Sequence, residues 1–140
     1  MVPLTIVYRG ELRCLATHGP SAVELVTDAP KDNHGRGESF SPTDLVAAAF
    51  GTCMLTIMGI AAKRDGINLE GTQIAVEKHM TAVPPRRIAR LVAHFTMPAG
   101  IPVASHAPLE RAAHTCPVAL SLHADVVQEV VFTWPQAAHG

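Results

Sequence analysis

The sequence predicts an α+β fold in which helices pack on one face of antiparallel sheets. Three features of the 140 residues predict it: short β-branched and apolar runs at the start, one apolar segment at residues 45–62, and two long alternating segments followed by a pair of helices. A chain of this length forms one domain with a core of its own. We therefore predict a single domain over residues 1–140.

Three short strands are expected before the apolar segment, at residues 4–9, 11–18 and 22–28. Glycine and proline residues separate these runs and favour turns between them. An antiparallel meander is the simplest arrangement of three strands joined by short turns. Residues 29–40 are rich in Pro, Lys, Asp, Asn, His, Gly and Arg, so we expect a loop there.

A long helix is expected to begin at Pro42, whose fixed φ suits a first helical turn. The hydroxyl of Ser41 can cap that turn, and Asp44 places a negative charge where the helix dipole favours it. The helix is expected to end before Gly66, after two basic residues that suit its C-terminal dipole. No residue from 45 to 62 is charged, so the whole circumference of this helix must be covered.

The apolar segment reaches the minimum length of a membrane span, but Ala, Gly and Thr dominate it rather than Leu and Ile. We therefore interpret it as a central helix of the core and expect no membrane partner. The first residues lack the basic region and the longer apolar core of a secretory signal. A cytoplasmic location is the resulting expectation.

Two long strands are expected in the second half, at residues 73–80 and 90–97, because apolar and polar residues alternate there. Pro84 and Pro85 lie between them and cannot donate ladder hydrogen bonds, so they mark the loop of a hairpin.

A helical stripe follows, and it includes a thiol. Its four residues fall at i, i+3, i+4 and i+7: Leu109, Ala112, Ala113 and Cys116. Pro117 begins a new helical turn, which makes Cys116 the expected N-cap of a short last helix. Residues 126–134 alternate as a final strand, and we expect residues 136–140 to be frayed.

Composition excludes several classes of function. Eleven basic and twelve acidic residues give a net charge of -1, and aromatic residues make up 4%, so we expect no nucleic-acid partner. The closest metal-ligating group, His114, Cys116 and His123, fits no zinc spacing, and we expect neither a metal nor a cofactor. Three cysteines are too few for a disulfide scaffold.

Cys53 and Cys116 each lie on a helix that faces the same small core, so the two thiols can meet. A thiolate attacks a peroxide bond, and the resulting sulfenic acid condenses with a second thiol to a disulfide. Cys53 lies beyond the reach of the helix dipole, so its activation requires a cation, for which arginine is suited because it stays charged when buried.

Two other interpretations of the cysteines stay open at this point. Buried thiols are frequently small core residues without chemistry, and Cys14, in an early strand, is interpreted in this way. A Cys-His acyl-transfer site is the second, although nothing nearby supplies an oxyanion loop or an orienting partner.

Two motifs resemble those of the OsmC/Ohr family. Residues 41–53 read SPTDLVAAAFGTC and resemble its S-P-x-[ED]-L-x-x-A-A-x-x-x-C segment. Residues 116–118 read CPV and resemble its second motif, C-P-[VY]. The order of the expected elements agrees with this family along nearly the whole chain.

The resemblance implies an OsmC-like fold built as an intertwined homodimer, with antiparallel sheets wrapped around long central helices and active sites at the subunit interface. It implies a thiol-dependent peroxidase that reduces organic hydroperoxides and is regenerated by a dithiol reductant. Cys53 would be the peroxidatic cysteine and Cys116 the resolving cysteine. An early arginine stabilises the thiolate in the family, and Arg9 is the nearest match, with Arg36 as the rival.

The first turn of the helix departs from the hydroperoxide resistance branch of the family. That branch has a glutamate directly after the proline, whereas this chain has Thr43 there and Asp44 one position later. A shift of one residue turns a helical side chain by about 100°. Asp44 is therefore expected either to take over the role of the glutamate or to cap the helix. A small-ligand binding or stress protein with little turnover is the alternative function.

Overall fold

The computed structural model describes residues 1–135, so the predicted fraying of residues 136–140 lies outside the described part. The chain forms two compact units, Met1–Val46 and Ala47–Gly140, whose boundary falls inside helix α1 (Pro42–Arg64). In the described residues each unit has its own three-stranded sheet. The single domain over residues 1–140 stays a prediction.

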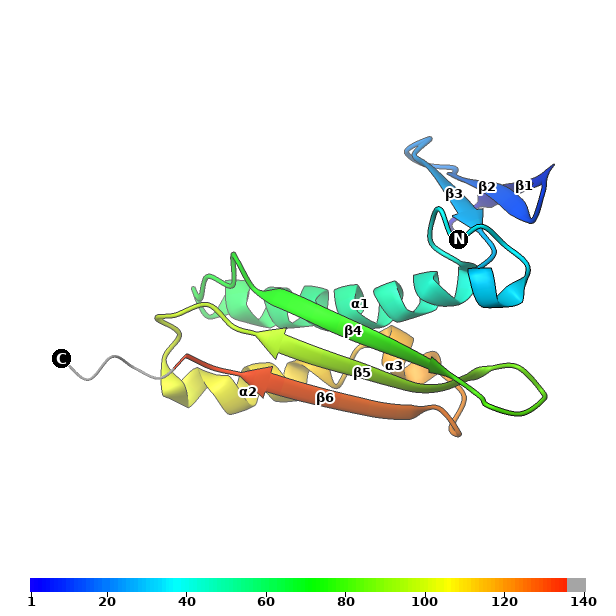
Figure 1. Cartoon of the computed structure of the whole chain (residues 1–140). Coiled ribbons are helices and arrows are strands. Elements are labelled where there is room, and N and C mark those ends of the chain that lie inside the picture. The colour runs from blue at the N-terminus through cyan, green and yellow to red at the C-terminus, as the bar shows by residue number, and fades with distance from the viewer. Residues whose placement is uncertain (136–140) are drawn as a thin grey trace. The chain divides into compact units, whose positions relative to one another are not determined.

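The sheet of the N-terminal unit is an antiparallel meander of three strands, as predicted (Figure 1). Its strands are β1 (Leu4–Gly10), β2 (Arg13–His18) and β3 (Glu24–Asp28), in that order across the sheet. The loop before α1 has one short 3-10 turn, η1 (Lys31–Asn33).

The predicted starts of two strands are wrong because residues there have positive φ angles. Glu11 and Leu12 have φ angles of 50° and 63°, so they form a two-residue hairpin turn and β2 begins at Arg13. Both central residues of a type I′ turn need a positive φ. Ala22 has a φ of 56° and lies in the next turn, which delays β3 to Glu24.

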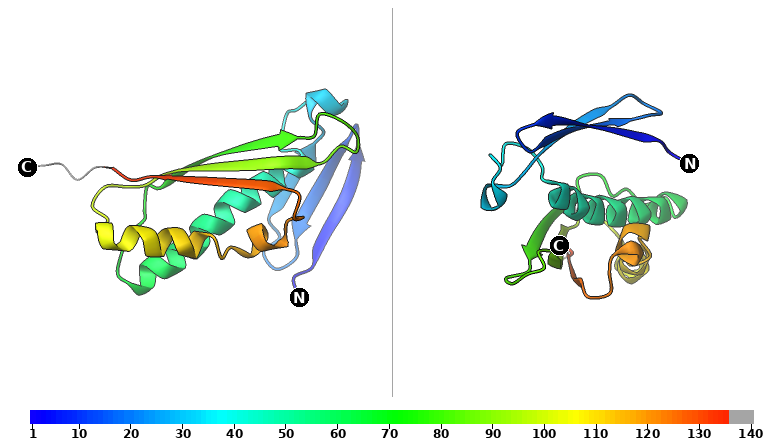
Figure 2. Two further views of the ribbon diagram at one scale, coloured as in Figure 1. Left: turned by 90° about the horizontal axis from the view of Figure 1, so that it is seen from below. Right: turned by 90° about the vertical axis from the view of Figure 1, so that its right-hand side faces the viewer.

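The C-terminal unit has two layers, a sheet and a layer of helices on one of its faces (Figure 2). The sheet has the order β4 (Gln73–Met80), β5 (Ile88–Thr96) and β6 (Val127–Thr133). The helical layer contains most of α1 together with two shorter helices, α2 (Val103–Ala113) and α3 (Pro117–Ser121). The hairpin between β4 and β5 and the helix pair confirm the predicted elements.

This second sheet is mixed, so the expectation of purely antiparallel sheets is wrong. Strand β6 pairs with β5 in parallel, from Arg90 opposite Val127 to Thr96 opposite Thr133. Helices α2 and α3 lie between the two strands in the sequence and provide the crossover that a parallel pair requires.

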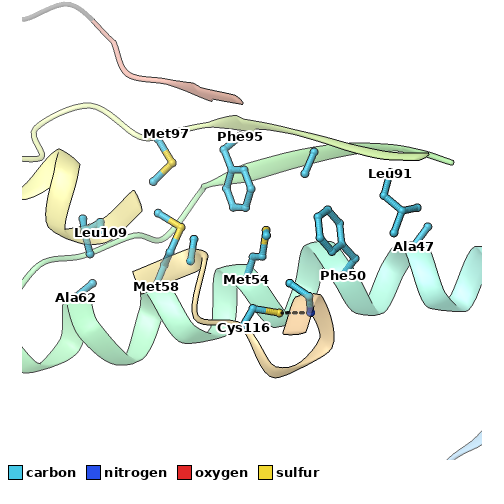
Figure 3. Close-up of a cluster of buried hydrophobic side chains, with 13 residues drawn as sticks. Ala47, Phe50, Met54, Met58, Ala62, Leu91, Phe95, Met97, Leu109 and Cys116 are labelled. Atoms are coloured by element: carbon cyan, nitrogen blue, oxygen red, sulfur yellow. Dashed lines mark hydrogen bonds between the residues drawn. The ribbon is translucent and has the colours of Figure 1, made fainter. Parts of the chain in front are cut away.

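The core of the C-terminal unit lies between these layers, as Figure 3 shows. One stripe of α1 enters it with five buried residues at helical spacing: Ala47, Phe50, Met54, Met58 and Ala62. Gly51 lets the helix approach β4 closely, because a Cβ there would lie 2.8 Å from Cγ2 of Val76.

The opposite side of α1 is not covered in the single chain. Ile60 is 63% exposed, and Thr52 and Thr56 on the same side are exposed as well. Both threonine hydroxyls donate to helix carbonyls one turn back, at 2.8 Å each, so this side presents mainly methyl groups. One chain alone therefore does not cover the whole circumference of the helix, and cover by a second chain stays a prediction.

Candidate active site

The first turn of α1 is fixed by a reciprocal pair of hydrogen bonds. The Ser41 hydroxyl accepts the Asp44 N–H at 3.1 Å, and the Asp44 carboxylate accepts the Ser41 N–H at 2.8 Å. This is a capping box, because the N-cap and the third helical residue satisfy each other's N–H groups. The prediction that the helix begins at Pro42 is confirmed, and Asp44 caps it. A catalytic role of Asp44 stays a prediction.

Thr43 shares this first turn. Its hydroxyl oxygen lies 3.2 Å from the hydroxyl oxygen of Ser41, so the two can share a hydrogen bond. Thr43 stands at the position of the family's glutamate, and Asp44 follows it. Both side chains thus form hydrogen bonds within the first turn of the helix.

Cys53 lies in the middle of α1, one residue from the buried stripe. It is partly buried and packs against the hydrophobic core of the C-terminal unit. Its neighbour Met54 is 1% exposed, whereas Thr52 on its other side is exposed. The thiol is therefore positioned at the border between the core and the open side of the helix.

Cys116 lies at the bend where α2 has ended and α3 begins. It is fully buried, and its Sγ accepts the N–H of Ala119 at 3.4 Å (Figure 3). Pro117 occupies the first turn of α3, so the chain begins a new helix directly after the thiol. The predicted N-cap role of Cys116 is confirmed.

Cys53 packs against the same apolar core that contains Cys116, and the prediction that the two thiols meet stays a prediction. Burial in the core, first, and then the hydrogen bond to Cys53 raise the pKa of the Cys116 thiol. The N–H groups of Ala119 and Val118 act in the opposite direction on the pKa of Cys116. A partly exposed thiol beside a fully buried one can support oxidation followed by disulfide formation.

The arginines of the N-terminal unit differ in their partners. Arg36 forms an exposed ion pair with Glu11 at 2.8 Å. Arg9 lies at a register shift of β1, between Tyr8 and Gly10, and is exposed. Within residues 1–135 no ion pair of Arg9 is observed.

Arg13, which no motif of the sequence singled out, forms ion pairs with Asp28 and Glu38. The Asp28 carboxylate is 1% exposed and accepts the Glu38 N–H at 2.9 Å. The Glu38 N–H, first, and the charge of Arg13 hold the pKa of Asp28 below its ordinary value. Arg13 pairs directly opposite Asp28 in the register of β2 and β3, so aligning the two strands would have found this pair.

Two features bear on metals and membranes. Within residues 1–135 no group of three His, Cys, Asp or Glu side chains could hold a metal ion. Helix α1 is long and apolar enough to cross a membrane by length and composition, a test that core helices also pass. Its buried stripe against the sheet is the arrangement of a core helix. The absence of a metal, a cofactor and a membrane partner stays a prediction.

The sequence profile of the OsmC-like protein family matches residues 35–130, which include both thiols and the capping box. The chain belongs to the OsmC-like protein family. A solved structure from Psychrobacter arcticus 273-4, described as a candidate osmotic stress induced and detoxification response protein, is 41% identical. The match covers 95% of this chain and 96% of that one, with a TM-score of 0.89.

Two further solved structures share the OsmC-like fold at lower identity. An organic hydroperoxide resistance protein OsmC from Legionella pneumophila is 18% identical, with a TM-score of 0.75 over 95% of this chain and 96% of that one. The organic hydroperoxide resistance protein OhrB of Bacillus subtilis is 15% identical, with a TM-score of 0.69 over 95% and 98%. No curated protein matches the chain significantly. The OsmC-like fold expected from the two motifs is confirmed.

Proposed function

We propose that this OsmC-like protein is a thiol-dependent peroxidase that reduces organic hydroperoxides, of the alkyl or lipid type. The observation that carries the proposal is the placement of Cys53 and Cys116, two thiols of unequal burial, at one apolar core. The similarity to proteins named for organic hydroperoxide resistance supports the substrate class. Apolar side chains around Cys53 favour a substrate with an apolar tail.

The proposed reaction has two steps. The Cys53 thiolate attacks an oxygen of the hydroperoxide, the O–O bond breaks, and the alkoxide takes a proton from water and leaves as the alcohol. Cys53 is then a sulfenic acid. The hydroxide left by that water takes the proton of Cys116, the Cys116 thiolate attacks the sulfur of Cys53, hydroxide leaves, and the disulfide forms. A dithiol reductant returns both thiols by exchange.

Arg9 is the proposed cation for the Cys53 thiolate. Its rival Arg36 is engaged by Glu11, and Arg13 by Asp28 and Glu38, whereas no carboxylate partner of Arg9 is observed in residues 1–135. Replacing Arg9 by Ala is expected to slow the peroxide step more than replacing Arg36 by Ala. Equal losses in single-turnover rates would contradict this choice.

The peroxidase test is a reaction of the reduced protein with one equivalent of cumene hydroperoxide. We expect a mass loss of two hydrogens and a peptide that links Cys53 to Cys116. Cys14→Ser is the matched control, because Cys14 is a half-buried thiol on β2 and is expected to leave the reaction unchanged. Unchanged free thiols after the treatment would overturn the proposed function.

We also propose that the protein acts as a homodimer in the cytoplasm, where thiols stay reduced. Support comes from uncovered apolar residues in the single chain, among them Leu4, Ile6 and Tyr8 on one face of β1 and Ile60 on α1. A solution mass of twice 14.8 kDa is expected. Ile6→Lys should shift the protein to monomer, whereas Val83→Lys, in the exposed hairpin loop, should not.

A second function, binding of a small apolar ligand with little turnover, is favoured by one observation. Thr43 occupies the position of the family's glutamate and lies beside the Ser41 hydroxyl. A large gain in peroxidase rate in Thr43→Glu would mean that the natural site lacks a catalytic part. No gain would mean that Asp44 or another acid already serves, and would favour the peroxidase.

A further inference from the structure

Gln128 is a polar residue on the side of β6 that faces the helical layer. It pairs with Leu91 of β5, a fully buried residue of the core, and directly paired residues lie on the same face of a sheet. Side chains of a strand alternate between its two faces, and the next two residues on this face, Val130 and Phe132, pack against the core. A glutamine in this series departs from the apolar pattern, so packing against the core does not explain it.

The Gln128 amide is bound to α3. Its Nε2 donates to the carbonyl oxygen of Ala119 at 3.0 Å, and the N–H of the same Ala119 donates to the Sγ of Cys116 at 3.4 Å (Figure 3). The first of these hydrogen bonds is partly buried and the second is buried. Gln128 is thus linked to the Cys116 sulfur through a single residue.

Helix α3 has little stability of its own. It has only five residues, and helices shorter than about 12 residues are marginal in water without tertiary contacts. The carbonyls of its last turn have no partner within the helix, and Gln128 supplies one for Ala119. The position of Ala119 therefore depends on its link to β6 as well as on its packing.

The position of Ala119 matters for the charge of Cys116. Burial in the core, first, raises the pKa of this thiol, whereas the N–H groups of Ala119 and Val118 lower the pKa. Cys116 must lose its proton before it can attack, because the thiolate is the nucleophile. An Ala119 N–H that is held against the sulfur therefore favours the reactive form of Cys116.

We propose that Gln128 is a positioning residue for the resolving step: by holding Ala119 against the Cys116 sulfur, it speeds the formation of the disulfide and leaves the peroxide step unchanged. The proposal rests on the proposed peroxidase function and assigns one residue to its second step. In that step the hydroxide left by the first reaction takes the proton of Cys116, the thiolate attacks the sulfur of the Cys53 sulfenic acid, the S–O bond breaks and hydroxide leaves. Gln128 acts on this step through Ala119.

The first test compares three variants of the full chain. Gln128→Met keeps the length of the side chain but cannot donate, Gln128→Lys restores a donor, and Gln73→Met is the matched control at an exposed glutamine of β4. The reduced proteins receive one equivalent of cumene hydroperoxide, and two rates are measured in quenched samples: the loss of hydroperoxide and the formation of the disulfide between Cys53 and Cys116. We expect Gln128→Met to slow the disulfide about three- to tenfold, the range of one partly buried hydrogen bond, with the loss of hydroperoxide unchanged. We expect Gln128→Lys to restore most of the rate.

Three outcomes would overturn the proposal: disulfide formation in Gln128→Met as fast as in Gln73→Met, an equal slowing of both steps, or a Gln128→Lys variant as slow as Gln128→Met. An equal slowing is what a general loss of stability produces. The ratio of the two rates therefore separates a positioning role from a merely structural one.

A second measurement needs no peroxide. In a chain with Cys14→Ser and Cys53→Ala the only thiol is Cys116, and its Cβ chemical shift, followed against pH by NMR with labelled cysteine, reports its titration. Adding Gln128→Met is expected to raise the midpoint by about 0.5–1 pH unit, because the Ala119 N–H is no longer held against the sulfur. An unchanged midpoint would contradict the proposal even where the peroxidase reaction proceeds. The proposed function fails separately, if cumene hydroperoxide leaves no sulfenic acid on Cys53 of Cys116→Ser that dimedone can trap.

Discussion

The N-terminal and C-terminal units bury different kinds of side chain. Every buried apolar residue among residues 1–135 lies at Ala47 or later. The buried residues of the N-terminal unit are polar: Thr27, Asp28 and Ser41. The first unit is therefore organised by hydrogen bonds and ion pairs, and the second by an apolar core.

This difference in buried side chains suits the two units to different roles. The C-terminal unit has the packing needed to hold Cys53 and Cys116 at one core, since both helices that carry them enter the same core. The N-terminal unit leaves apolar side chains on β1 uncovered, and Arg13 and Arg36 form ion pairs with carboxylates. Such a unit needs additional cover for its sheet, which is the physical reason for the proposed dimer.

Among substitutions that test this difference between the units, Phe50→Ala is expected to change stability the most. Phe50 is 0% exposed in the C-terminal core, and its removal is expected to lower the free energy of unfolding by about 3–5 kcal/mol. Urea unfolding followed by circular dichroism measures the change. Val83→Ala, at an exposed position of the hairpin loop, is the control with little expected effect. A loss no greater than that of the control would break the distinction between the units.

The next largest change in stability is expected from Asp28→Asn in the N-terminal unit. The pKa of Asp28 lies below its ordinary value of 3.8, so the carboxylate stabilises the folded unit above that pH. This stability is lost as the pH falls through the lowered pKa. The difference between wild type and variant is therefore expected to shrink with acid.

The ring NMR signals of Tyr8 report on this unit during urea unfolding, because Tyr8 is the only tyrosine of the chain. Glu24→Gln, on the same strand β3, is the matched control and removes a carboxylate that is exposed. A difference between Asp28→Asn and wild type that stays constant into acid would show that the charge of Asp28 is not what stabilises the unit.

A smaller effect is expected from two glycines of α1. In Gly51→Ala the new methyl would lie 2.8 Å from Val76 Cγ2. Overpacking of this kind lowers the free energy of unfolding by about 1–3 kcal/mol, and the higher helix propensity of alanine offsets about 1 kcal/mol of that loss. A Cβ at Gly59 meets nothing within 4 Å, so Gly59→Ala is expected to stabilise one chain alone. Thermal unfolding compares the two, and destabilisation by Gly59→Ala at dimer-forming concentrations would place a second chain on that side of the helix.

The smallest effect is expected from Ser41→Ala, which removes the N-cap hydroxyl of α1. Loss of such a cap costs about 1 kcal/mol. Ser39→Ala is the nearby control, because its hydroxyl donates to the Val26 carbonyl and caps no helix. Urea midpoints measure both, and a loss well above 2 kcal/mol would mean that Ser41 does more than begin the helix.

The sequence by itself determined most of the elements and both thiols. Pro42 with Ser41 and Asp44 predicted the start of α1, and Pro117 predicted the N-cap position of Cys116, because these effects depend on residues close in the chain. The alternating residues of β4 and β5 and the two family motifs could also be recognised from residues close together in the chain.

Only the tertiary structure decided the parallel pairing of β6 with β5, the ion pair of Arg13 with Glu38 and the open side of α1. Each depends on segments distant in the sequence, whose pairing no local pattern specifies. The placement of the two thiols belongs to the same class: their helices were predictable from local sequence, but Cys53 and Cys116 reach one core only because the fold packs both helices together.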